Sequence, residues 1–136
     1  MFRSAHGPGI TVLICTYNGA AVLPPTLEHL AAQQVPPGLN WEVLLVSNAS
    51  TDDTLAMAPR LWAELGSPAP LRVLNEPRPG KHFALPLGFA EAYYPYICIV
   101  DDDNWLAPDY LGTALEIMEA NPEIGALGGV PEAVCE

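Results

Sequence analysis

Basic residues are scarce in this sequence. Its 136 residues include five lysines and arginines against sixteen aspartates and glutamates, which gives a formal net charge of −11. Proteins that bind nucleic acid or anionic membranes use clustered cations, so neither is expected as the main partner. A strongly acidic chain does suit a site that attracts a metal ion.

Cysteine and histidine are also rare, with three of each. So few scattered cysteines favour neither a disulfide framework nor a zinc site, and a reducing cytoplasm is the simplest compartment. Cys15 and Cys98 lie inside apolar runs, where a small buried thiol is the usual state. The histidines have neither metal-ligand nor catalytic-triad spacing, so surface or structural roles are expected for them.

Long hydrophobic runs are missing as well. No apolar stretch approaches the roughly twenty residues of a membrane-spanning helix, and no signal peptide is recognisable. Membrane association, if any, is expected to be peripheral, at the inner face of the membrane.

Two phosphate-binding motifs are also absent. No Gly-x-Gly-x-x-Gly follows the first apolar run, and Gly80-Lys81 lacks the flanking residues of a P-loop.

Half of the residues are hydrophobic and 15% are charged, which predicts a folded chain with a sizeable core. We expect a single domain over residues 1–136, in which apolar runs alternate with helical patterns. Strands are expected at 10–15, 41–46, 71–74, 97–100 and 124–130. Helices are expected at 23–31, 55–65, 81–94 and from 108 to 120.

This alternation predicts an α/β fold with a doubly wound, mainly parallel sheet. In the common strand order 3-2-1-4, the first strand lies beside the fourth, and ligands bind in the crevice at their carboxyl ends. The polar loops at 16–18, 47–50 and 101–103 would then converge on one crevice.

The sharpest change from apolar to charged residues in the chain is the apolar run 97–100 followed by Asp101, Asp102 and Asp103. Such a run predicts a strand buried on both faces. Three adjacent carboxylates repel one another, so a cation is expected beside them. If the backbone stays extended, Asp101 and Asp103 point to one side, where they could meet a hard divalent ion, and Asp102 points to the other. The alternative is a solvated acidic turn before the next helix.

Four segments together resemble the family 2 inverting glycosyltransferases, which have the GT-A fold. They are "TVLICTYNGA" (11–20), "WEVLLVSNASTDDT" (41–54), "NEPRPGKHFAL" (75–85) and "IVDDDNWLAPDYL" (99–111). The resemblance implies a Rossmann-like nucleotide-binding topology, a nucleoside-diphosphate sugar as donor with UDP favoured, and Mn²⁺ or Mg²⁺ as cofactor. It also implies a saccharide or lipid-linked acceptor.

The resemblance also implies roles for single residues. Thr16 and Tyr17 match positions that line the base, the loop 47–53 closes over base and ribose, and Lys81 matches a basic residue near the donor. Asp103 matches the metal-binding aspartate, with Asp101 beside it near the ribose or sugar. The implied nucleotide-sugar site comprises Thr16, Tyr17, Asn18, Ser47, Asn48, Ser50, Asp53, Lys81, Asp101 and Asp102. A plain helix cap at 47–53 and a solvated Lys81 remain the alternatives.

The sequence departs from the family pattern at three points. Ser47 stands where an acidic residue is usual, which leaves base selectivity open, and Pro86 replaces a common asparagine. The general base that deprotonates the acceptor comes from a later segment in this family, and no residue up to Glu136 matches it. We therefore expect the donor-binding half of a longer enzyme. A nucleotidyltransferase, a receiver-like signalling module and an inactive binding domain are the rival classes.

Overall fold

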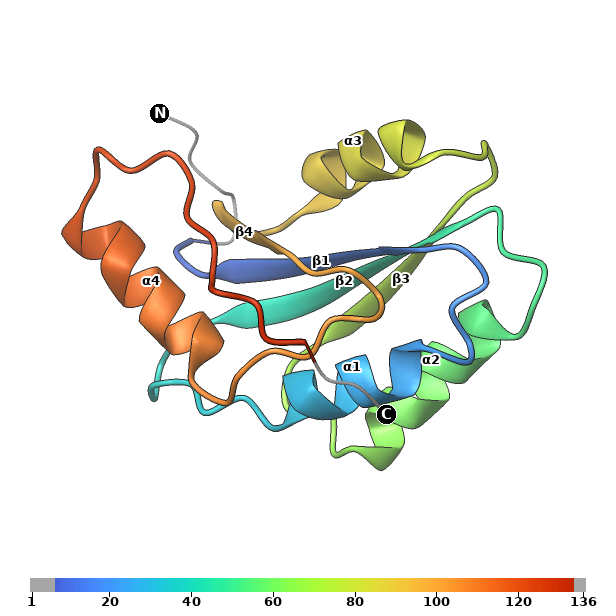
Figure 1. Ribbon diagram of the computed structural model, residues 1–136, viewed down its shortest axis with the longest axis horizontal. Coiled ribbons are helices and arrows are strands. Elements are labelled where there is room, and N and C mark those ends of the chain that lie inside the picture. Colours follow the sequence, from blue (N-terminus) through green and yellow to red (C-terminus); the bar gives the residue numbers. More distant parts are fainter. Residues whose placement is uncertain (1–6, 134–136) are drawn as a thin grey trace.

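A four-stranded parallel sheet forms the frame of the computed structural model, which describes residues 7–133 (Figure 1). Its strands are β1 (Ile10–Thr16), β2 (Trp41–Asn48), β3 (Leu71–Glu76) and β4 (Tyr96–Ile99). The order is β3-β2-β1-β4, so the first strand lies beside the acidic one, with Val12 opposite Cys98. The predicted fold class and strand order are confirmed.

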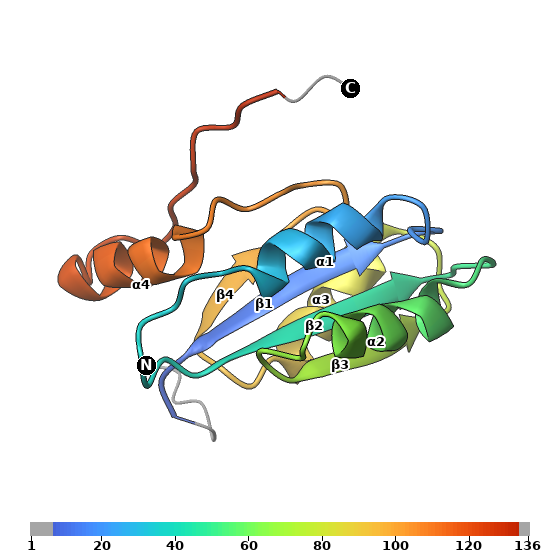
Figure 2. The same ribbon diagram turned by 90° about the horizontal axis from the view of Figure 1, so that it is seen from below.

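Helices cover both faces of this sheet, as a doubly wound fold requires (Figure 2). The helices α1 (Leu23–Ala31) and α2 (Thr54–Glu64) lie on one face, and α3 (Lys81–Glu91) lies on the other. The helix α4 (Tyr110–Ala120) inserts Leu111 into the core on the side of α1 and α2. No helix in residues 7–133 has the length and apolar character that a membrane crossing requires.

The two central strands supply most of the core because both of their faces are covered. Val12, Ile14, Val43 and Leu45 meet α1 and α2, and alternate residues of the same strands face α3. The helix α3 approaches β1 closely at Gly88, where an added Cβ would lie 2.4 Å from Leu13 Cδ1. A side chain at this position would force α3 away from the sheet.

A buried carboxylate joins the strands at the amino edge of the sheet. Glu42 of β2 is 1% exposed and accepts hydrogen bonds from Thr11 Oγ1 at 3.2 Å and from an Arg72 guanidinium nitrogen at 2.8 Å. The same guanidinium lies 3.5 Å from the centroid of the Tyr93 ring. The tyrosine that follows donates its backbone N–H to Thr11 Oγ1, and α3 ends at Glu91 rather than at the predicted residue 94.

Two strand predictions need correction. The acidic strand is not buried on both faces, because β4 lies at the edge of the sheet and Ile99 is 50% exposed. The continuous apolar run predicted the strand correctly but overestimated its burial. Residues 124–130 form no strand. They run away from the sheet in an irregular path that contains three glycines, and Val130 is 93% exposed (Figure 2).

Candidate functional site at the carboxyl edge of the sheet

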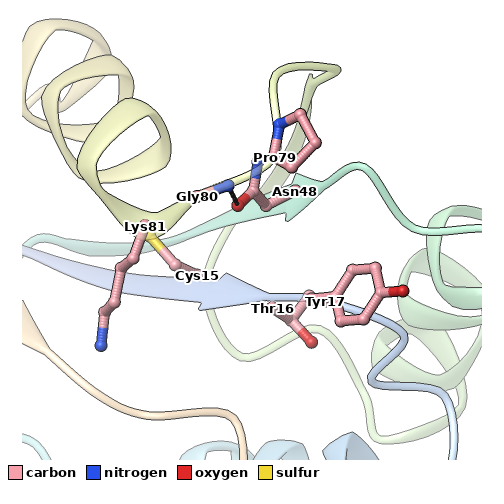
Figure 3. A pocket seen from close by; sticks show the side chains of 7 residues that line it. All are labelled: Cys15, Thr16, Tyr17, Asn48, Pro79, Gly80 and Lys81. Atoms are coloured by element: carbon pink, nitrogen blue, oxygen red, sulfur yellow. Dashed lines mark hydrogen bonds between the residues drawn. The ribbon is translucent and has the colours of Figure 1, made fainter.

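The loops that follow β1, β2, β3 and β4 meet at the carboxyl edge of the sheet, as the parallel topology requires. A pocket of about 370 Å³ opens there (Figure 3). Its lining residues come from the ends of β1 and β2 and from the segment that enters α3: Cys15, Thr16, Tyr17, Asn48, Pro79, Gly80 and Lys81. Four of these were candidate site residues, whereas Cys15, Pro79 and Gly80 were not.

The three aspartates form a turn rather than an extended strand, which corrects the predicted alternation. The Asn104 N–H donates to the Asp101 carbonyl oxygen at 3.1 Å and closes the turn. The Asp102 carboxylate accepts a hydrogen bond from Thr16 Oγ1 at 2.7 Å, and its backbone carbonyl accepts one from Thr26 Oγ1 at 2.7 Å. Asp101 and Asp103 are exposed. Two hydroxyl groups therefore hold the middle residue, and its two neighbours stay exposed.

Lys81 supplies the cation that the acidic cluster was expected to have. Its Nζ lies 3.0 Å from Asp101 Oδ1, and both side chains are about half exposed. This hydrogen bond raises the pKa of Lys81 above its ordinary value, so the ammonium stays charged at neutral pH. The first residue of α3 therefore connects the pocket to the acidic turn.

Asn48 holds the loop between β3 and α3 in place. Its Nδ2 donates to the carbonyl oxygens of Glu76 at 3.1 Å and Arg78 at 2.6 Å. Its Oδ1 accepts the Gly80 N–H at 2.9 Å, the bond drawn in Figure 3. Gly80 has φ = +125°, which only glycine adopts easily. Both amide protons of Asn48 are thus used to shape the pocket.

Asn18 and Ser50 connect the loops after β1 and β2. The Asn18 N–H donates to Ser50 Oγ at 3.0 Å, and Asn18 Oδ1 accepts the Thr51 N–H at 2.7 Å. Asn18 has φ = +48°, a left-handed conformation that asparagine tolerates better than most residues. These two candidates therefore fix the relative position of the two loops.

The Asp52 carboxylate organises the start of α2, whereas Asp53, a predicted nucleotide-sugar-site residue, makes no side-chain cap bond there. The Asp52 carboxylate accepts the backbone N–H of Ala20 at 3.2 Å and of Thr54 at 3.0 Å, and it also accepts the Thr54 hydroxyl. The Thr54 hydroxyl lowers the pKa of Asp52. Asp53 instead pairs with Arg60 at 3.6 Å, outside the pocket lining. An aspartate two residues before a helix is a known turn signal, which would have indicated Asp52.

Ser47 does not lie in the pocket. It is fully buried opposite Thr16 in the β1–β2 register, and its hydroxyl has no hydrogen-bond partner within residues 7–133. Ser47 is also absent from the residues that line the pocket, and its assignment to the nucleotide-sugar site stays a prediction.

The pocket also contains a thiol. Cys15 is partly buried at the end of β1, and desolvation raises the pKa of its thiol despite the nearby Lys81 ammonium. Burial raises the pKa of Cys98 to about 11. Both cysteines therefore stay protonated at neutral pH and offer no thiolate ligand.

A divalent metal fits the acidic turn only if a ligand completes the site. Within the described part of the chain, no three His, Cys, Asp or Glu side chains lie close enough to hold an ion together. Mg²⁺ commonly uses one or two carboxylates together with water and substrate phosphates. The exposed carboxylates of Asp101 and Asp103 provide such a partial set, and Asp101 is bonded to Lys81 of the pocket lining.

Strand order 3-2-1-4, a pocket at the strand ends and an acidic turn after the fourth strand define an α/β domain with the GT-A fold. The family model described as "Glycosyl transferase family 2" matches residues 11–136. The chain belongs to the family 2 glycosyltransferases.

Several known proteins are similar to it. An uncharacterised glycosyltransferase of Mycobacterium tuberculosis is 33% identical over 98 residues, which are 72% of this chain and 38% of the relative. The mannosyltransferase PcManGT from Pyrobaculum calidifontis, solved in complex with GDP-Man and Mn²⁺, is 32% identical with a TM-score of 0.72. That match covers 87% of this chain and 33% of the mannosyltransferase.

The Staphylococcus aureus protein TarS, solved as residues 1–349 in complex with UDP-GlcNAc, shares the fold with a TM-score of 0.71 at 24% identity. The match covers 84% of this chain and 32% of that solved part of TarS. This chain thus spans less than two-fifths of the length of these proteins.

Proposed function

We propose that residues 1–136 bind the nucleoside-diphosphate sugar donor of a metal-dependent glycosyltransferase that transfers the sugar to an acceptor hydroxyl. The observation that carries this proposal is the juxtaposition of Lys81 and the acidic turn at the rim of a pocket, with Lys81 Nζ 3.0 Å from Asp101 Oδ1. Family membership and the donor complexes of PcManGT and TarS support it.

The roles follow from charge and exposure. Tyr17 is 64% exposed at the pocket wall, so its ring is free to stack on a base. Asp101 and Asp103 would hold Mn²⁺ or Mg²⁺ with the donor diphosphate. When bound, the metal neutralises the charge that develops on the leaving nucleoside diphosphate. The Lys81 ammonium adds a second positive charge at the same place.

The acceptor side is not assigned to any residue of this chain. A saccharide or lipid-linked hydroxyl is the proposed acceptor, by analogy with the family. No carboxylate in residues 7–133 is proposed as the general base. We therefore expect residues 1–136 alone to bind donor and to show at most slow donor hydrolysis. Robust transfer to an acceptor by this polypeptide would mean that the base lies within it.

Calorimetric titration of UDP and GDP tests the donor role. We expect binding of at least one nucleotide in the presence of Mn²⁺, and loss of binding in excess chelator. Asp103→Ala should abolish the metal-dependent heat, because Asp103 supplies an exposed carboxylate of the partial metal site. Asp109→Ala is the matched control, since it removes an exposed aspartate a few residues further along. Equal nucleotide binding with chelator would exclude the metal role.

A further inference from the structure

The middle aspartate of the acidic turn is oriented differently from its neighbours. Asp102 is partly buried, whereas Asp101 and Asp103 are exposed. Its carboxylate accepts the Thr16 hydroxyl and its carbonyl oxygen accepts the Thr26 hydroxyl, each at 2.7 Å. Thr16 and Thr26 are 3% and 0% exposed. Two buried donors on different elements therefore hold one residue.

The two threonines are themselves held in place. Thr16 ends β1 in register with β2, and Thr26 lies on the buried face of α1. An added Cβ at Gly19 would lie 2.0 Å from Thr16 Oγ1, so the chain leaves room for this hydroxyl. The acidic turn is thus attached to the rigid centre of the fold rather than to another loop.

The helix α1 and Gln33, just beyond its C-terminal end, also hold the segment that follows the turn. Gln33 Nε2 donates to the Ala107 carbonyl oxygen at 2.6 Å, and Gln33 Oε1 accepts the Leu111 N–H at 3.1 Å. The Trp105 ring stacks on His29, with ring centroids 5.2 Å apart. Contacts with α1 and with Gln33, which follows its C-terminal end, therefore recur from Asp102 to Leu111, and Asp102 is the point at which this attachment begins.

We infer, building on the proposed metal-dependent function, that Asp102 is a positioning residue and not a ligand of the metal or the donor. Its bonds to Thr16 and Thr26 turn the backbone so that Asp101 and Asp103 face outward at the pocket rim. Oδ2 of Asp102 accepts the buried Thr16 hydroxyl at 2.7 Å, and this bond fixes the direction of the carboxylate toward the end of β1. Asparagine keeps an acceptor oxygen at the same place. The positioning role therefore needs this oxygen of residue 102 but not its negative charge.

Mn²⁺ titration followed by electron paramagnetic resonance separates the two roles in the full 136-residue chain. Asp102→Asn should bind Mn²⁺ within about threefold of the parent, whereas Asp102→Ala and Thr26→Val should lose about tenfold or more, the usual cost of removing an orienting partner. Thr113→Val, an exposed threonine on α4, is the matched control and should change nothing. Asp103→Ala marks the effect of losing a true ligand.

Backbone ¹⁵N relaxation of residues 101–104 gives a readout that does not depend on metal. The turn should stay ordered in Asp102→Asn and become mobile in Asp102→Ala and Thr26→Val. If Asp102→Asn loses Mn²⁺ as completely as Asp103→Ala while the turn stays ordered, Asp102 is a ligand and the inference is overturned. Unchanged order in both Asp102→Ala and Thr26→Val would also overturn it. If the parent chain binds no Mn²⁺, the proposed function fails, and the relaxation data still decide whether Asp102 anchors the turn.

Discussion

Replacing Lys81 with methionine should have opposite effects on the two proposed ligands. In the free chain, the Lys81 ammonium lies 3.0 Å from Asp101 Oδ1 and occupies the position that a cation would take. A metal that binds Asp101 must displace it. A donor diphosphate, in contrast, would gain the same ammonium as a partner. Lys81→Met keeps most of the side-chain stem and removes only the charge.

The size of each effect follows from exposure. The side chains of Lys81 and Asp101 are 55% and 54% exposed, so their ion pair contributes about 0.2–1 kcal/mol. Its removal should tighten binding of Mn²⁺ alone by up to about fivefold. Loss of a charge-assisted hydrogen bond to phosphate costs about 1.5–3 kcal/mol. Nucleoside diphosphate affinity in saturating Mn²⁺ should therefore fall by about tenfold to a hundredfold.

Two titrations measure these effects, one with Mn²⁺ alone and one with UDP or GDP in saturating Mn²⁺. Arg60→Met is the matched control, because it removes one positive charge from an exposed pair with Asp53 outside the pocket lining. The control should shift neither affinity by more than a small amount. Weaker Mn²⁺ binding in Lys81→Met would refute the competition between ammonium and metal. Unchanged nucleotide affinity would refute the contact between Lys81 and the diphosphate.

Three further predictions concern stability and are measured by urea unfolding. Arg72→Met leaves the buried Glu42 carboxylate without its cation and should cost about 3 kcal/mol, while a smaller loss would mean that water reaches the carboxylate. Gly88→Ala should cost about 1–3 kcal/mol through overpacking against β1, and Gly125→Ala, which has open space around it, should be nearly neutral. The hydrogen bond from the Arg78 guanidinium lowers the pKa of Glu76. The stabilisation of the fold by this pair is therefore present above the ordinary glutamate pKa, about 4.3, and disappears as the pH falls through the lowered value. Glu76→Gln should therefore shrink the stability difference between pH 7 and pH 3, and an unchanged difference would contradict this account.

The sheet order could be predicted from the sequence because it depends on local patterns. Apolar runs alternate with helical spacings, and right-handed crossovers leave few topologies. The helix α2 begins at Thr54, close to the predicted position, since polar capping residues precede it. The exposure of β4 could not be predicted from its own residues, because a fully buried strand and an apolar edge strand have the same sequence pattern. The prediction of a strand at 124–130 relied on a local apolar pattern, which does not show whether a neighbouring strand is present to pair with it.

The candidate site was predictable as a set of loops but not as a set of orientations. The turn at Asp102 depends on Thr26, which lies 76 positions earlier in the chain, and no local pattern reveals that contact. Ser47 was interpreted through its place in a motif, whereas its burial follows from the register with Thr16. Residue type and position indicated which segments meet. Long-range hydrogen bonds decide which side chains face the pocket.

The edge strand β4 has a consequence for how this polypeptide behaves in concentrated solution. Within residues 7–133, β1 is its sole strand partner, and its sequence Tyr-Ile-Cys-Ile carries no charge along the open side. An uncharged, apolar edge is a template on which a second molecule can add a strand. At neutral pH the net charge of −11 keeps molecules apart, but near the isoelectric point of about 4.4 that repulsion vanishes. The protein should therefore aggregate when the pH is lowered toward its isoelectric point, and Ile99→Lys should prevent this aggregation.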